Sequence, residues 1–240
     1  MNKIGFNFNT GALLFLVLLF LTRFRAYMDN PAEFFISILI ILPGIILGIT
    51  FHEFGHAFAA YKLGDELPKK QGRVTLNPLA HIDLMGFICL IFAGFGWGKP
   101  VQININAYKH PRRDRLLVSF AGVIMNAVII LVLALITKAA LPALLSNEAP
   151  AAYYVLQILL QAISINIMLM IFNLLPVPPL DGFNVITEIF DLRKYSWYGK
   201  FYSAGGLILM VLIFFRITSY IITPAVQGIF DLVMNGIILA

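Results

Sequence analysis

The sequence is poor in charged residues and in cysteine. Only 12% of its 240 residues are charged, while 60% are hydrophobic. Soluble domains usually carry about 25% charged residues, and a folded chain of this length cannot bury so much apolar surface. We therefore expect the excess apolar surface to face lipid. The single cysteine, Cys89, excludes an intrachain disulfide and a cysteine-rich zinc module.

The net charge of +5 does not by itself indicate a nucleic-acid partner. The basic residues gather in the connections between apolar runs, notably 62–73 and 99–115. Cationic loops beside membrane spans usually mark the cytoplasmic side. We therefore predict a multi-pass protein of the plasma membrane, with the lipid bilayer and no nucleic acid as partner.

Several apolar runs are long enough to cross a bilayer, which needs about 20 residues per helix. The expected helices lie at 12–21, 33–61, 116–136 and 153–175, with one or two more within 204–240. The predicted fold class is an all-α membrane protein, a polytopic bundle of about six transmembrane helices. The run at 12–21 is expected to be a retained span or a membrane-embedded helix.

Two segments between these spans differ from the rest. Residues 84–97 are apolar, but they are too few for an ordinary span and are rich in glycine, so we expect a re-entrant segment. Residues 101–106 alternate apolar and polar side chains, which is the period of a strand. This strand or hairpin could offer a free edge to an extended peptide, or it could be an ordinary connection.

The second apolar run contains the pattern H-E-x-x-H at 52–56. On a helix, His52 and His56 lie on one face, so both imidazoles can reach one zinc ion at about 2.1 Å. Glu53 projects at an adjoining angle, where it can take a proton from a water at the metal. Ionisable residues inside a membrane helix are energetically costly, so this cluster indicates a functional site.

A catalytic zinc ion needs a third protein ligand. Asp181 is a better candidate than His81 and Asp83, which form a pair just before the re-entrant run. The prolines within 176–179 break the preceding helix, and Asp181-Gly182 makes a turn that can aim a carboxylate. Alternatively, Asp181 caps a helix at 183–190. His110 lies in a basic loop and is expected to be solvated. The remaining candidates resemble loop or helix-surface charges: Asp65, Glu66, Glu188 and Asp191.

The two metal motifs resemble those of the site-2 proteases, which are intramembrane metalloproteases that cut transmembrane segments of other proteins. The resemblance rests on H-E-F-G-H at 52–56 and N-L-L-P-V-P-P-L-D-G at 173–182. Three further stretches are similar to the same family: L-N-P-L-A-H-I-D at 76–83, F-G-W-G-K-P-V at 95–101 and A-G-V-I-M-N at 121–126. The resemblance covers roughly 50–184, more than half of the chain.

The resemblance implies one zinc ion per chain, bound by His52, His56 and Asp181, with Glu53 as the general base. It also implies that Asn126 and Asn173 lie near the active site and hold substrate backbone or an oxyanion. Buried membrane amides equally often bridge helices, so both roles stay open for these two residues.

His81 also has two interpretations. It is either a polar contact in the active site or its entrance, or part of a capped turn. In the second case, Asn77-Pro78 starts the turn and Asp83 is hydrogen-bonded nearby.

The chain resembles a compact member of the family, without a PDZ-like insertion between the metal motifs or a CBS-like tail. We expect a single domain over 1–240, with a catalytic core at about 33–190 and peripheral helices at 1–30 and 200–240. Val123 stands where many relatives carry proline after Ala-Gly.

Together these features predict proteolysis of a transmembrane protein substrate at a site near the cytoplasmic side of the membrane. Because a helix shields its own peptide bonds, substrates with Gly, Pro or Asn in their spans should be cut better. The alternative is a transporter of zinc or another metal, since intramembrane His and Asp residues also line ion paths. Such a protein would repeat its ligands along pore helices, whereas here they cluster at one depth.

Overall fold

The protein is an all-helical bundle, described by a computed structural model at residues 21, 28–93 and 96–240. In chain order the elements are α2 (Pro31–Lys62), α3 (Leu67–Lys70), the 3₁₀ turn η1 (Pro78–Ala80), α4 (Leu84–Ala93), the 3₁₀ turn η2 (Ile105–Ala107), α5 (Pro111–Leu145), α6 (Pro150–Asn173), α7 (Asp181–Phe190), the 3₁₀ turn η3 (Leu192–Lys194), α8 (Tyr198–Phe214), α9 (Ile217–Val233) and the π-helical turn η4 (Met234–Ile238). The predicted all-α class is confirmed. The predicted helix at 12–21 lies outside the described residues except for Leu21.

Four of the described helices are long and apolar enough to cross a membrane: α2, α5, α6 and Ile217–Ile238. Helix α8 is apolar but has only 17 residues. Arg216 adopts a left-handed conformation with φ 57° and separates α8 from α9, so the region 204–240 divides into two helices. The predicted number of about six spans is not confirmed by the described part of the chain.

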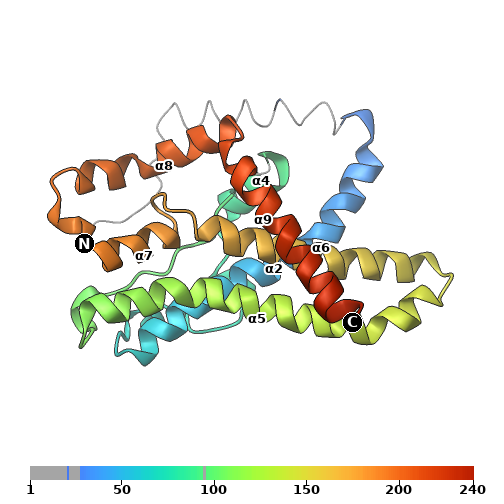
Figure 1. The fold of residues 1–240 in the computed structure, drawn as a ribbon, viewed down its shortest axis with the longest axis horizontal. Coiled ribbons are helices and arrows are strands. Elements are labelled where there is room, and N and C mark those ends of the chain that lie inside the picture. The colour runs from blue at the N-terminus through green and yellow to red at the C-terminus, as the bar shows by residue number, and fades with distance from the viewer. Residues whose placement is uncertain (1–20, 22–27, 94–95) are drawn as a thin grey trace.

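Helices α5 and α6 run side by side in opposite directions, and α9 crosses α6 (Figure 1). Their contact is the largest buried cluster of the bundle, built from aliphatic side chains and alanines. Its buried members are Ile129, Ile130, Leu133, Ala134, Ala162, Ile163, Ile167, Val233 and Ile238. Apolar side chains that point away from this cluster stay exposed on the same helices, as expected where lipid replaces water.

Helix α2 packs against both α5 and α6 through small residues. A Cβ atom at Gly44 would lie 2.7 Å from the Cα atom of Ala162 in α6. At Gly55 it would lie 2.7 Å from the carbonyl oxygen of Ala121 in α5. Small residues allow such close approach of membrane helices, and here they bring the H-E-x-x-H end of α2 between α5 and α6.

The segment predicted to be re-entrant begins and ends at the same place. Ile82 forms an antiparallel bridge with Gly98, and the backbone N–H of Lys99 donates to the carbonyl oxygen of His81 at 2.7 Å. Helix α4 fills only Leu84–Ala93 between these ends. The segment therefore returns to its starting point instead of crossing the bundle.

The predicted strand at 101–106 is not confirmed: within the described residues, 101–104 belong to no strand, and the chain then turns into η2. Its backbone donors bond to carboxylates instead of a neighbouring strand. The N–H of Val101 donates to Glu53 Oε2 at 3.1 Å, and the N–H of Asn104 donates to Asp65 Oδ2 at 2.6 Å. Two of its N–H groups are thus bonded to carboxylates and not to a partner strand.

Candidate metal centre

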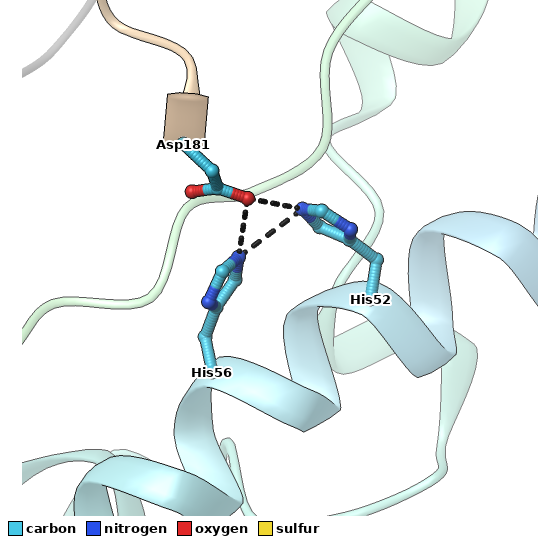
Figure 2. A group of neighbouring side chains, drawn as sticks. All are labelled: His52, His56 and Asp181. Carbon is cyan, nitrogen blue, oxygen red and sulfur yellow. Dashed lines mark hydrogen bonds and ion pairs between the residues drawn. The ribbon is translucent and has the colours of Figure 1, made fainter. Parts of the chain in front are cut away.

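Three side chains from two distant segments meet at one point (Figure 2). The Nε2 atoms of His52 and His56 lie 3.2 Å and 3.1 Å from Asp181 Oδ2, and 3.1 Å from each other. The three side chains are only 10 to 14% exposed. The structure thus brings together the three residues that the sequence marked as metal ligands.

The outer ring nitrogens of both histidines are occupied by the protein. His56 Nδ1 lies 2.7 Å from the carbonyl oxygen of Val118, which can only accept, so Nδ1 carries the proton. His52 Nδ1 lies 2.8 Å from Asn126 Oδ1. When either ring is neutral, its lone pair is therefore on Nε2, which faces Asp181.

The hydrogen bonds of two buried amides, Asn126 and Asn166, determine that the oxygen of Asn126, and not its nitrogen, faces His52. Asn126 Nδ2 donates to the carbonyl oxygen of Gly48 and to Asn166 Oδ1. Asn166 Nδ2 donates to the carbonyl oxygens of Gly44 and Ala162. Because these carbonyls can only accept, the amide nitrogens must face them, and the Asn126 oxygen is left for His52.

This arrangement of donor atoms fits a cation. With both rings neutral, two imidazole lone pairs and the Asp181 carboxylate converge on one point, as the ligands of a cation do. The spacing of 3.1 to 3.2 Å is close to the ~3.4 Å between ligands of a tetrahedral zinc ion with bonds of about 2.1 Å. Within the described chain this is the one His, Cys, Asp or Glu group that could hold a metal.

Asp181 reaches this point because α6 ends shortly before it. The chain turns at 174–180, and Asp181 is the first residue of α7, with Leu180 in the capping position. The alternative prediction, in which Asp181 caps this helix, is wrong, because Leu180 occupies the N-cap position and Asp181 already lies within the helix. The carboxylate is therefore free to point at the histidines.

Helix α7 is anchored at its other end by a buried carboxylate. Glu188, which the sequence suggested was a surface charge, is 3% exposed. It pairs with Arg115 at 3.0 Å and with Arg193 at 2.6 Å. Phe183 packs against the ring of Phe201 in α8, with centroids 5.6 Å apart. These contacts hold α7, and with it Asp181, against α5 and α8.

Glu53 faces the connecting segments on another side of α2. Its Oε2 accepts from the N–H of Val101 and lies 3.7 Å from Arg73 Nη2. Within the described part of the chain, Oε1 has no hydrogen-bond donor. One carboxylate oxygen is thus held, while the other is available to a proton.

Gly122 of α5 lies directly against both histidine rings. A Cβ atom there would lie 2.5 Å from His56 Nε2 and 2.6 Å from His52 Cε1. Real Cβ atoms essentially never come so close, so only glycine allows both rings to take these positions.

The other predicted residues lie in different surroundings. Asn173 is the last residue of α6, and its Nδ2 donates to the carbonyl oxygen of Leu169 in the same helix. His81 is fully buried, and its Nε2 bonds to the carbonyl oxygen of Thr75 at 2.7 Å. Burial and the nearby Arg73 charge lower the pKa of His81 despite the bond to Thr75, so the ring is neutral at pH 7.

The capped-turn interpretation of His81 is supported by its neighbours. Asn77 Oδ1 accepts from the N–H of Leu79 at the start of η1, and Asp83 Oδ1 accepts from the N–H of Gly86. No contact joins the His81 side chain to the three converging side chains.

Sequence reasoning did not single out Asn166 or Arg73. Asn166 could have been found as a polar side chain in the middle of an apolar span. Arg73 had no distinguishing signal, because it lies among other basic residues in a loop whose charge was attributed to the cytoplasmic side of the membrane. The burial of Asp65, which is 1% exposed, had no local signal, because its partner Asn104 lies far along the chain.

Comparison with known proteins agrees with this geometry. The model of peptidase family M50 matches residues 138–215, which include Asp181. The chain is 35% identical over 187 residues to a protein of Bacillus subtilis (strain 168) named "Putative zinc metalloprotease YwhC", over 77% of this chain and 84% of that protein. The chain belongs to peptidase family M50.

A second M50 relative is more distant. It is "Putative zinc metalloprotease Rip2" of Mycolicibacterium smegmatis (strain ATCC 700084 / mc(2)155), 28% identical over 209 residues, which are 85% of this chain and 75% of the relative. A protein of the same name from Mycobacterium tuberculosis (strain ATCC 25618 / H37Rv) is 29% identical over 147 residues, 60% of this chain and 54% of the relative. No solved structure matches the chain.

Proposed function

We propose that His52, His56 and Asp181 hold the zinc ion of this M50 metalloprotease and that Glu53 is its general base. The observation that carries the proposal is the convergence of three lone-pair donors, within 4.8 Å of one another, beside a glutamate in an apolar helix. Bound there, zinc supplies Lewis-acid polarisation of a carbonyl and a lowered pKa of water.

The residues of the chain then divide the work of peptide hydrolysis. Asn126 holds His52 by Nδ1, so that Nε2 keeps its lone pair for the metal. Val118 does the same for His56 through its carbonyl oxygen. Glu53 accepts the proton of the attacking water on Oε1, since Oε2 is already held, and later passes the proton to the leaving amine. Asn173 is left as a candidate contact to substrate backbone.

We propose that the substrate is a transmembrane segment of another protein, or the chain next to one. The donor set is buried among helices with the length and composition of membrane spans. A substrate helix shields its peptide bonds by its own hydrogen bonds and must unwind to be cut. Spans containing Gly, Pro or Asn should therefore be cut faster than uniformly aliphatic ones.

The site belongs near one surface of the membrane, and we assign it to the cytoplasmic side of the plasma membrane. Helix α2 has 32 residues, or about 48 Å at 1.5 Å per residue, which exceeds a hydrocarbon core of about 30 Å. His56 lies only about 9 Å before its end. The adjoining connections carry most of the basic residues of the chain, which favours the cytoplasmic side.

A metal transporter is not supported. Among the described residues, a single cluster could hold a metal, and no further cluster marks a path away from it. Membership of a peptidase family also favours hydrolysis over transport.

The test compares the purified wild type with Glu53→Gln in detergent, with Glu66→Gln as a control at an exposed carboxylate. Zinc content and cleavage of a panel of single-span membrane peptides are measured on the same samples. We expect about one zinc ion per chain in all three and cleavage lowered by about 100- to 10,000-fold in Glu53→Gln alone. Equal cleavage by Glu53→Gln would refute its role as the base. Zinc binding without any cleavage, but with zinc flux into liposomes, would revive the transporter.

A further inference from the structure

Arg73 is a buried arginine beside the proposed base. It follows α3 in the connection between α2 and η1, and only 4% of its surface is exposed. Its Nη2 lies 3.7 Å from Glu53 Oε2. Among the described residues, Glu53 is the one carboxylate that pairs with it. A buried guanidinium is costly unless it is paired and hydrogen-bonded, so the position of Arg73 depends on Glu53.

The same guanidinium binds both ends of the returning segment 82–98. Its Nη1 donates to the carbonyl oxygen of Ala80, just before the segment, and its Nη2 donates to the carbonyl oxygen of Lys99, just after it. The two ends also bridge each other through Ile82 and Gly98. Arg73 thus joins two neighbouring backbone strands to one side chain of α2.

Both carboxylate oxygens of Glu53 lie next to the chain at the end of this segment. Val101, two residues after Lys99, donates its N–H to the oxygen that faces Arg73. A Cβ atom at Gly98 would lie 3.5 Å from the other carboxylate oxygen, so the chain passes closely over the glutamate. If the segment opened, Glu53 would lose Val101 and the carbonyls that hold Arg73 in place.

We propose that Arg73 is a positioning residue for Glu53, which it holds by Oε2 and joins to the backbone on both sides of segment 82–98. The inference rests on the proposed function, since it takes Glu53 as the base. Arginine suits this position because its planar fork can serve two carbonyls and a carboxylate at once. A lysine has the charge but not the fork.

The test uses the full chain in detergent, with Arg73→Gln, Arg73→Lys and the exposed Arg113→Gln as a matched control. Zinc content, kcat and KM are measured on a single-span peptide that the wild type cuts. We expect Arg73→Gln to lower kcat by about 100-fold, the order of magnitude for a misplaced catalytic group, with KM within about twofold and zinc unchanged. Arg73→Lys should lose about tenfold, because it keeps the charge.

Several outcomes would overturn the proposal. One is a kcat of Arg73→Gln equal to that of Arg113→Gln. A second is a raised KM at unchanged kcat, which would make Arg73 a substrate contact. A third is loss of zinc together with activity, which would make it a residue of the fold. If Arg73→Gln does not fold, Arg73→Lys decides: lowered kcat at full zinc content supports the proposal, and wild-type kcat overturns it.

Amide hydrogen exchange over 99–104 gives a readout that does not need catalysis. Arg73→Gln and Glu53→Gln should each speed exchange at Val101, and the double variant should add little, because both break one set of contacts. Additive effects would refute the coupling. This readout stays informative if the wild type cuts nothing, in which case the proposed function fails on its own. If the wild type cuts, Glu53→Gln does not, and Arg73→Gln has the kcat of the wild type, then Glu53 remains the base and only the positioning role of Arg73 is refuted.

Discussion

Two residues that are adjacent in the sequence, His52 and Glu53, are held by different parts of the molecule. His52 is fixed from the interior of the bundle, where Asn126 and then Asn166 connect it to backbone carbonyls of α2 and α6. Glu53 is held from outside the helices, by Arg73 and by the N–H of Val101. Metal affinity should therefore depend on helix packing, and turnover should depend also on the connecting segments.

The largest expected effect comes from filling the space at Gly122. Gly122→Ala places a Cβ atom at 2.5 Å from His56 Nε2 and 2.6 Å from His52 Cε1, so both rings must move. We expect zinc content far below one per chain and cleavage lowered by more than about 100-fold. Gly228→Ala is the matched control, because a Cβ atom there has no neighbour within 4 Å. Full zinc content in Gly122→Ala would show that the rings can move without loss of the site.

Asn126→Ala, which removes a contact of His52 inside the bundle, should weaken metal binding without lowering turnover. Without Asn126 Oδ1, His52 Nδ1 loses its acceptor and the ring its orientation. We expect zinc affinity to fall by about 10- to 100-fold in chelator competition, with kcat close to wild type at saturating zinc. Asn166→Ala should also lower zinc affinity, but by less, because Asn166 is one hydrogen bond further from His52. A lowered kcat at unchanged zinc affinity would show that the contacts of His52 inside the bundle control turnover and not metal binding.

The smallest effect should come from Asp65→Asn, on the side of the connecting segments. Asp65 accepts from the N–H groups of Leu67 and Asn104, and an amide can accept only one of these bonds with its single oxygen. We expect kcat to fall a few-fold at unchanged zinc content, with a loss of about 1 to 3 kcal/mol in stability, seen as a lower Tm. Glu66→Gln, at an exposed carboxylate paired with Lys70, should change neither. Loss of zinc in Asp65→Asn would show that the connecting segments also control metal binding.

The parts of the fold and site that could be predicted are those with local signals. Helical spacing placed His52 and His56 together, and the prolines before Asp181 located the break that frees it. Arg73 and Asn166 could not be placed, because their roles come from partners such as Lys99 and Asn126 that only the fold brings near. The alternation at 101–106 predicted a strand, but two of the N–H groups of this segment bond to the carboxylates of Glu53 and Asp65.

The distance along the chain between the ligands has a consequence for biosynthesis. His56 and Asp181 are 125 positions apart (181 − 56), and α5 and α6 lie between them. During synthesis, the emerging chain carries its two histidines long before the carboxylate that completes the donor set. An unfinished chain in the insertion machinery therefore lacks a complete site. If Asp181 is the third ligand as proposed, we expect the protein to become active only after α7 has been made.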